Sequence, residues 1–377
     1  MTVPEATGVT EGVGDKAAAA VTDGATAPAR DLTTAPARDL TTAPVRDLAT
    51  APVRDLRALP KAHLHLHLEG SMRPATLADL ARSQGAPVPD VSAYGTFGQF
   101  GLRYQEAVSL VRDEDGLRRI VREVVEDAAA DGAVWVEPAV NPMGYATLFG
   151  RSPAYVLDLM LDEALGTADR LGIGCGLLVT ALRHLDPREA VDLARLAARR
   201  ADAGVVAFGL AADESLYPPE PFADAFALAR AGGLIAAPHA GELAGPGSVL
   251  GALDALGAQR IQHGVRAVED PGLLARLAAE GIVLDVCPTS NTRLGIVESL
   301  TAHPLPDLLA AGVRCTIAAD DSLLFGPGLL DEYETARTAL ALTDRQLAAV
   351  AEDSLRASGA PADTVAQALK GLRAWLD

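Results

Sequence analysis

Cysteine is scarce in this chain. Cys175, Cys287 and Cys315 are the only three among 377 residues, and they lie far apart in the sequence. An odd, scattered set of this kind is typical of reduced thiols rather than of a disulfide framework. Long apolar runs are also missing, since none reaches the roughly 18–20 residues that span a bilayer. The first residues have neither the basic nor the apolar region of a secretory signal. We therefore expect a cytoplasmic protein.

Positive charge is in short supply as well. The 32 Lys and Arg residues face 50 Asp and Glu residues, which gives a formal net charge of −18. Phosphate backbones and anionic lipid surfaces are bound by clustered basic side chains, so this charge argues against nucleic-acid and membrane partners and favours a small-molecule ligand. No lysine lies between Lys61 and Lys370. Many barrel hydrolases hold two metal ions with a carboxylated lysine inside the barrel, and this part of the chain has no lysine, so any metal site is expected to hold a single ion. The sequence predicts no particular oligomeric state.

Residues 1–56 differ in composition from the rest of the chain. They contain no aromatic residue, and from Thr26 an eight-residue unit recurs as TAPARDLT, TAPARDLT, TAPVRDLA and TAPVRDL. A proline in each unit blocks a long helix, and large apolar side chains are too few to offset the entropy lost on ordering. We predict a disordered low-complexity tail over 1–56, either a tether or an expansion without a function, followed by a folded domain over 57–377.

Short apolar runs follow one another through the folded domain, with helix-length amphipathic stretches between them. Runs that are rich in Val, Ile and Leu and bounded by glycine are typical of strands buried on both faces. Eight occur, at 61–67, 132–140, 172–182, 204–212, 233–241, 260–265, 281–289 and 312–320. This alternation predicts an α/β protein with a (β/α)8, or TIM, barrel. The alternative is an open doubly wound sheet, although the first strand–helix unit lacks the GxGxxG pattern. We expect extra helices after the first strand, over 68–131, and at the C-terminus, over 342–376.

Four side chains at the ends of predicted strands have the chemistry of a metal site. His65 and His67 lie two apart in the first run, so both rings point to the same side of that strand. His239 ends the fifth run and Asp320 ends the eighth, and barrel enzymes assemble their sites at this end of the strands. Each residue alone could be structural. Together they suit one Zn²⁺ per chain, which would lower the pKa of a bound water and supply hydroxide at neutral pH.

Three further polar residues lie close in sequence to the predicted ligands or at a neighbouring strand end. Glu242 follows His239 by three residues, and a glutamate in a water-excluded barrel mouth can act as an acid because its pKa is raised. His263, at the end of the sixth run, could hold or deprotonate the attacking water. Asp321 is expected to accept a hydrogen bond from the substrate, since the ion compensates its repulsion with Asp320. A buried structural role is the alternative for Glu242 and His263, and a helix N-cap or a solvated turn is the alternative for Asp320 and Asp321.

Five short motifs occur in order from about Leu59 to near the C-terminus. They are LPKAHLHLHLEGS, PHAGE, QHG, CPTSN and ADD, and together they resemble the adenosine deaminase family of the amidohydrolase superfamily. The resemblance implies a barrel enzyme with one zinc ion held by His65, His67, His239 and Asp320.

The same resemblance implies how the substrate is held. Glu242 would protonate purine N1, His263 would assist the hydroxide, and Asp321 would contact N7. Glu69 would hydrogen-bond the ribose 5′-hydroxyl, the backbone N–H of Ala212 would meet N3, and His67 would contact substrate as well as zinc.

The reaction implied by the resemblance is hydrolytic deamination. Hydroxide attacks C6 of a 6-aminopurine, and ammonia leaves to give a 6-oxopurine. Adenosine or deoxyadenosine is the expected substrate. Adenine and aminodeoxyfutalosine are alternatives, because several positions near the pocket differ from the residues usual in the family, namely His63, Ala139, Gly209, Ala212, Gln262 and Ser322. Two hypotheses remain. The chain could be a different mononuclear amidohydrolase, or it could be a binding protein without activity.

Overall fold

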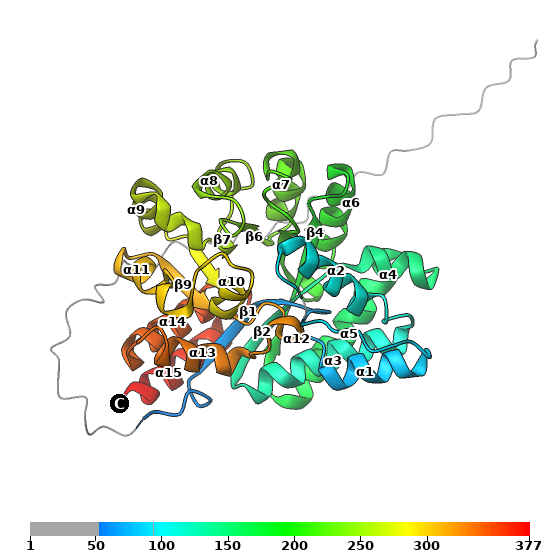
Figure 1. Ribbon diagram of the computed structural model, residues 1–377, viewed down its shortest axis with the longest axis horizontal. Helices are drawn as coiled ribbons and strands as arrows, with labels where there is room; N and C mark the ends of the chain where they lie inside the picture. The colour runs from blue at the N-terminus through cyan, green and yellow to red at the C-terminus, as the bar shows by residue number, and fades with distance from the viewer. Residues whose placement is uncertain (1–52, 93) are drawn as a thin grey trace, which may run out of the picture.

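The structure, a computed structural model, describes residues 53–92 and 94–377, and it contains the predicted barrel (Figure 1). Principal parallel strands follow one another around it in chain order. Their bounds are β1 (Lys61–His67), β2 (Ala133–Val140), β4 (Leu177–Leu182), β5 (Val205–Ala211), β6 (Ile235–Ala240), β7 (Arg260–His263), β8 (Val283–Val286) and β9 (Arg314–Ile317). A short strand, β3 (Gly174–Cys175), pairs with β2. The prediction of eight strands in a barrel is confirmed.

The first and last strands meet at the level of the predicted site. The N–H of His67 donates to the carbonyl oxygen of Asp320 at 3.1 Å, and the N–H of Asp320 donates to the carbonyl oxygen of His65 at 3.1 Å. Asp320 takes up a left-handed backbone with φ 60°, which costs a residue with a side chain roughly 1–2 kcal/mol. The contact that brings the edges of the barrel together therefore runs through three predicted metal ligands.

Helices cover the outside of the barrel. Ser, Thr or Asp caps begin several of them, for example Asp113, whose carboxylate accepts the N–H of Gly116 at the start of α3. The helices between strands are α3 (Glu114–Ala130), α5 (Pro153–Leu171), α6 (Pro187–Ala198), α7 (Ala223–Ala231), α8 (Pro246–Asp254), α9 (Pro271–Glu280) and α11 (Leu305–Ala310), and α14 (Asp344–Ala357) packs against β9 and β1. Within residues 53–92 and 94–377, no helix has both the length and the apolarity to cross a membrane.

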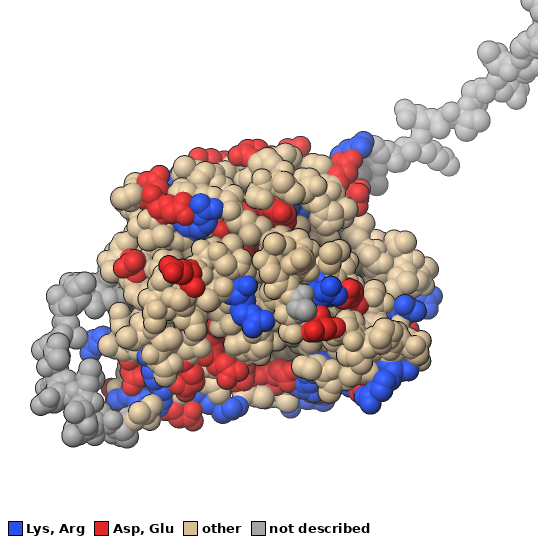
Figure 2. All heavy atoms as spheres, in the orientation of Figure 1, with Lys and Arg blue, Asp and Glu red and all other residues tan. Residues whose placement is uncertain are grey.

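Extra helices occur where the sequence predicts them. α1 (Pro74–Ser83) and α2 (Phe97–Val108) lie in the first crossover, and α15 (Ala362–Leu376) lies with α14 in the predicted C-terminal range. α13 (Leu329–Thr338) precedes that range and is an additional helix. Short helices in the loops are α4 (Pro142–Phe149), α10 (Pro288–Arg293) and α12 (Ser322–Phe325). On the face seen in Figure 2, acidic and basic side chains form small separate groups rather than one continuous basic surface.

Residues 53–56, at the end of the predicted tail, pack against the folded part of the protein. Residues 1–52 of the predicted tail lie outside the described residues, but 53–56 belong to the folded part. Leu56 is completely buried, and the indole N–H of Trp375 donates to the carbonyl oxygen of Asp55 at 2.7 Å. No local pattern indicates this packing, because the partner residue lies more than 300 positions away in the sequence.

A buried ion cluster crosses the lower part of the barrel. The guanidinium of Arg260 lies 2.8 Å from a carboxylate oxygen of Glu137 and 2.8 Å from one of Asp285, and all three side chains are fully buried. Hydrogen bonds satisfy the outer oxygens, since the indole N–H of Trp135 donates to Glu137 and the hydroxyl of Thr316 donates to Asp285, each at 2.8 Å. This cluster ties β2, β7 and β8 together below the predicted ligands.

Replacing Arg260 with methionine should strongly destabilise the protein. The change leaves two buried carboxylates without their cation, and breaking such a pair costs about 3–5 kcal/mol. The free energy of unfolding from urea titration measures this loss. Arg276→Met is the matched control, because the ion pairs of Arg276 with Asp254 and Glu280 are exposed and are worth at most about 1 kcal/mol. Equal losses in the two variants would contradict the assignment of Arg260 as a structural cation.

Candidate metal centre and active site

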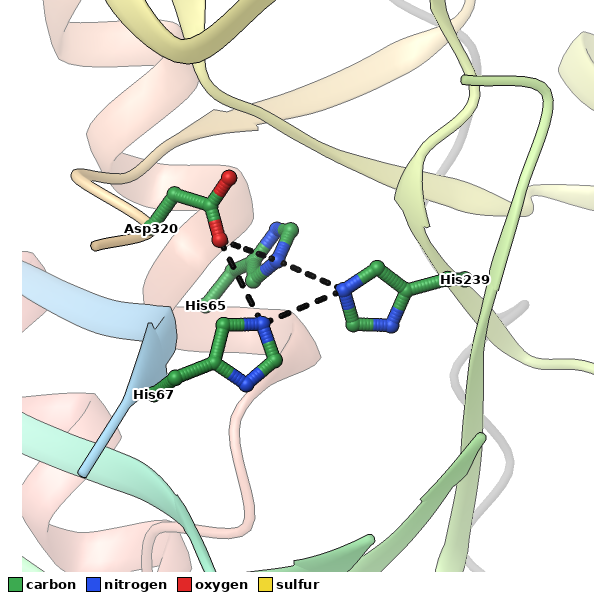
Figure 3. Close-up of side chains that lie close together, drawn as sticks. All are labelled: His65, His67, His239 and Asp320. Atoms are coloured by element: carbon green, nitrogen blue, oxygen red, sulfur yellow. Dashed lines mark hydrogen bonds and ion pairs between the residues drawn. The ribbon is translucent and has the colours of Figure 1, made fainter. Parts of the chain in front are cut away.

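The four predicted metal ligands converge at the carboxyl ends of the strands (Figure 3). Nε2 of His239 lies 3.2 Å from Nε2 of His65 and 3.2 Å from Nε2 of His67. Oδ1 of Asp320 lies 3.4 Å from Nε2 of His65 and 3.3 Å from that of His67. Donor atoms that share one zinc ion at about 2.0–2.2 Å lie roughly 3–4 Å apart, so these four distances are compatible with one metal ion shared by the four side chains.

The protonation of two of the rings is set by main-chain carbonyls. Nδ1 of His65 lies 3.2 Å from the carbonyl oxygen of Asp285, and Nδ1 of His239 lies 3.0 Å from that of Leu210. A carbonyl oxygen can only accept, so in each neutral ring the proton is on Nδ1 and Nε2 carries a bare lone pair. Two bare lone pairs 3.2 Å apart cannot hydrogen-bond to each other. They need a cation between them, and the donor set fits a metal ion.

Asp320 is held by a residue that the sequence analysis did not identify. The hydroxyl of Ser290, in α10, donates to Oδ2 of Asp320 at 2.7 Å, and Ser290 is buried. Oδ1 is thereby left to face the imidazoles. Ser290 belongs to the CPTSN motif, so the resemblance marked the segment, but no local pattern indicated which side chain would reach Asp320.

Glu242 faces the ligands from the loop after β6. This loop is held by Glu214, which accepts the main-chain N–H groups of Gly241 at 2.9 Å, Glu242 at 2.6 Å and Ala244 at 2.9 Å. Burial raises the pKa of Glu242 well above its usual value, and the negative charges of Asp320, Glu214 and Asp321 add smaller effects in the same direction. The carboxyl group is therefore suited to carry a proton at neutral pH.

His263 and Asp321 lie against the same centre. Nε2 of His263 is 3.5 Å from Oε1 of Glu242 and 3.8 Å from Oδ2 of Asp320. Asp321 is buried, and a Cβ atom added to Gly70 would lie 1.6 Å from its Oδ1. Only glycine at position 70 therefore allows the loop after β1 to approach Asp321.

A cavity of about 580 Å³ opens from the metal centre towards α2. His67, Glu69, Ala212, His239, Glu242, His263, Asp320 and Asp321 all line it, and its outer part is lined largely by apolar residues such as Phe97, Phe100, Leu102, Leu182 and Leu294. No lysine or arginine is among the described lining residues. Every predicted site residue except the deeper ligand His65 therefore lies on this one cavity.

Two other histidines do not belong to the metal centre. Nε2 of His63 accepts the N–H of Ala319 inside the barrel at 3.2 Å, and burial lowers the pKa of His63 to about 3. His303 is buried behind His263 and hydrogen-bonds to Asn291.

Comparison with known proteins identifies many similar sequences. The sequence profile of the adenosine deaminase family matches residues 60–375. A protein of Streptomyces virginiae named as an adenosine/adenine deaminase is 47% identical over 330 residues, which cover 84% of this chain and 97% of that protein. An aminodeoxyfutalosine deaminase of Acidothermus cellulolyticus is 35% identical over 294 residues, covering 74% and 82% of the two chains.

Solved structures have the same fold. An adenine deaminase from Arthrobacter aurescens matches with a TM-score of 0.78 and 30% identity, covering 84% of this chain and 99% of that one. An amidohydrolase from Burkholderia ambifaria, solved with bound zinc, matches with a TM-score of 0.78 and 29% identity, covering 85% and 93%.

Ser290→Ala should weaken metal binding without unfolding the protein. The hydroxyl orients Asp320, and the loss of such a supporting hydrogen bond typically costs 10–100-fold in metal affinity. Competition with a chromogenic chelator measures the affinity for Zn²⁺. Ser299→Ala is the control, because Ser299 is half-buried and its side chain bonds to that of Thr301 rather than to a predicted metal ligand. An affinity unchanged by Ser290→Ala would refute the supporting role of this hydroxyl.

Proposed function

Because the chain belongs to the adenosine deaminase family and is a metal-dependent purine deaminase, we propose that it converts adenosine and deoxyadenosine into inosine and deoxyinosine with one zinc ion. The observation that carries this proposal is the convergence of four candidate metal ligands with Glu242, whose pKa burial raises, on a cavity of nucleoside size that no lysine or arginine lines. His65, His67, His239 and Asp320 would hold the ion. When bound, it would lower the pKa of a water molecule and so supply the nucleophile for C6.

Glu242 acts as the general acid. Its carboxyl group is protonated by burial and by the surrounding acids, and it gives this proton to N1 of the purine as C6 is attacked. The ring then accepts the electron pair at N1 rather than developing a full negative charge there. The amino group leaves C6 as ammonia, so one water and one nucleoside become one 6-oxopurine nucleoside and one ammonia.

Asp321 recognises N7 as a donor rather than as the acceptor expected from the sequence. N7 of a 6-aminopurine carries a lone pair and no proton, so only a protonated carboxyl can hydrogen-bond to it. Burial, followed by the charge of Asp320, raises the pKa of Asp321 well above its usual value. Ala212, whose backbone is left-handed with φ 82°, lies on the same cavity and would present its N–H to N3.

Glu69 is prepared to accept a hydrogen bond from a sugar hydroxyl. Tyr145 donates to its Oε1 at 2.8 Å and Tyr104 donates to its Oε2 at 2.9 Å. Burial, followed by the charge of Glu69, raises the pKa of both tyrosines well above the usual value, so both remain donors. Each carboxylate oxygen keeps a second lone pair, and a ribose 5′-hydroxyl can use it.

The outer part of the cavity favours an uncharged substituent on the purine. Its described lining contains no lysine or arginine and includes Glu69. A phosphate, or the carboxylate of aminodeoxyfutalosine, would be placed there without an ammonium or guanidinium partner, which is unfavourable. Adenine is the second candidate substrate, because the two tyrosines already satisfy Glu69 and the purine contacts do not require a ribose.

A substrate panel tests the proposal. We expect zinc-loaded protein to release ammonia from adenosine and deoxyadenosine with kcat/KM values at least on the order of 100-fold above those for AMP and aminodeoxyfutalosine, because an unpaired buried anion costs several kcal/mol. Adenine is measured in the same series. A higher kcat/KM for adenine than for adenosine would replace the proposed substrate by the second candidate, and activity on none of these compounds would refute the proposal.

Glu242→Gln should lose most turnover and keep its metal. An amide cannot give up a proton as the carboxylic acid does, and general acid catalysis contributes on the order of 10²–10⁴-fold. Steady-state kinetics on adenosine and zinc analysis measure the two properties. Glu280→Gln, an exposed change on α9, is the control and should behave as the parent protein. A fully active Glu242→Gln variant would remove Glu242 from the role of acid.

A further inference from the structure

The last copy of the eight-residue repeat is bound to the folded protein through its Arg-Asp-Leu triplet. Leu56 is completely buried. The guanidinium of Arg54 donates to the carbonyl oxygens of Trp375 and, at 2.7 Å, of Leu376, and it lies 5.7 Å from the centre of the Trp375 indole. In Figure 1 the start of the described chain accordingly lies beside the C-terminal helix α15.

The main chain of the triplet is bound as well. Arg337, in α13, donates to the carbonyl oxygen of Arg54 at 2.9 Å. The indole N–H of Trp375 donates to that of Asp55 at 2.7 Å, and the ammonium of Lys61 donates to that of Leu56 at 2.9 Å. We call these partners, Lys61, Arg337, Trp375 and Leu376, the triplet site. It binds three consecutive carbonyl oxygens and the guanidinium of Arg54, and the Leu56 side chain is buried beside it.

The same triplet occurs at 30–32, 38–40 and 46–48, each eight residues from the next. We propose that the triplet site binds Arg-Asp-Leu as a ligand of this chemistry, and that the copy at 46–48 takes the place of 54–56 when the latter is impaired. Replacement lengthens the connection to β1 by eight residues. The entropic cost of a longer connection is small, because it grows only with the logarithm of the length. Leaving the triplet site empty costs more, because the burial of a leucine side chain is lost.

Variants of equal length test this replacement. Leu56→Ser is made in the parent chain and in a chain that also carries Leu32→Ser, Leu40→Ser and Leu48→Ser. With upstream copies intact, we expect the thermal midpoint to fall by less than about 2 °C and the Trp375 indole N–H to remain protected from hydrogen exchange. With all four leucines replaced, the midpoint should fall by roughly 5 °C and the N–H should exchange rapidly. The three upstream changes alone, with Leu56 intact, should have no effect.

An equal fall in both backgrounds would overturn the proposal, whether the protein is merely destabilised or fails to fold. Arg54→Ala, alone and with Arg30, Arg38 and Arg46 also changed to alanine, repeats the comparison with a milder change at a partly exposed side chain. A synthetic peptide TAPVRDLA should restore protection of the Trp375 N–H to the chain with four serines, and a peptide TAPVRDSA should not. Restoration by neither peptide, or by both, would contradict recognition of the triplet.

A separate observation concerns a hydrogen-bonded chain behind His263. The backbone N–H of Leu305 donates to Nδ1 of His303 at 3.1 Å. A backbone amide can only donate, so the neutral His303 ring carries its proton on Nε2, which lies 3.2 Å from Oδ1 of Asn291. The amide nitrogen of Asn291 then donates to Nδ1 of His263 at 3.2 Å. Burial lowers the pKa of His303 to about 4, in keeping with a neutral ring.

These hydrogen bonds give His263 the opposite tautomer to that of His65 and His239. Its Nδ1 accepts, so its proton is on Nε2, whereas Nδ1 of His65 and of His239 donates to a carbonyl oxygen. We propose that Asn291 and His303 are positioning residues that keep His263 as a hydrogen-bond donor to the attacking oxygen, and neither a metal ligand nor a base. The catalytic part of this inference rests on the proposed function; the tautomer does not.

Asn291→Asp tests the assignment because it replaces the amide donor by an acceptor of the same shape. In protein labelled with ¹⁵N-histidine, His263 of the parent should have a bare Nδ1 and a protonated Nε2, and the variant should have the reverse. We expect kcat on adenosine to fall on the order of 100-fold, with KM and zinc content nearly unchanged. Thr292→Val, the neighbouring change on α10 that removes only a bond to the carbonyl oxygen of Pro288, should leave spectrum and kcat as in the parent.

His303 is tested by two substitutions. His303→Gln keeps a donor for Asn291 and should retain much of the parent's kcat, whereas His303→Leu should behave like Asn291→Asp. A proton on Nδ1 of His263 in the parent spectrum would overturn the proposal. So would an unchanged kcat in a variant whose tautomer has reversed. If the parent deaminates none of the purines, the proposed function fails, and the spectrum still decides the tautomer.

Discussion

The active site depends on the repulsion between lone pairs that the fold forces together. Carbonyl oxygens of Asp285 and Leu210 hold the protons of His65 and His239 on Nδ1, so their Nε2 atoms face each other bare at 3.2 Å. The carboxylate of Asp320 adds a charge 3.4 Å from Nε2 of His65. Without a cation this arrangement is unfavourable, and with one the four side chains can serve as its ligands. The barrel can impose this geometry because its close packing resists the small shifts that would relieve the repulsion.

Barrel closure and ligand placement are one event in this protein. The main-chain bonds that join β1 to Asp320 involve His65 and His67, so the strand edges meet where the ligands meet. Below them, Arg260 joins three strands through buried carboxylates. Above them, Glu214 binds the loop that carries Glu242 through its main-chain N–H groups. Metal binding is thus expected to stabilise the closed barrel, since ligand affinity adds to folding stability.

The sequence predicted the elements with strong local patterns. Glycine-bounded apolar runs gave all eight principal strands, and the alternation of His65 and His67 gave two ligands on one side of β1. The sequence did not reveal the roles of Glu214, Ser290 or Asn291. Their partners depend on how loops fold over the barrel, and such loops have no periodic sequence pattern. The segment 53–56 was assigned to the tail for a similar reason: its composition is that of the repeats, while its binding partners lie on α13 and α15. The sequence could not indicate the raised pKa of Asp321, since this shift depends on burial beside Asp320.

Three non-glycine residues at strand ends around the cavity have a left-handed backbone conformation, namely Ala212, His263 and Asp320. Each conformation costs roughly 1–2 kcal/mol, and the rest of the fold must sustain it. Replacing one of these residues by glycine would relieve the backbone strain and stabilise the protein. The same replacement would remove a functional side chain or loosen the wall of the cavity. Thermostable descendants should gain their stability on the outer helices and leave this rim unchanged.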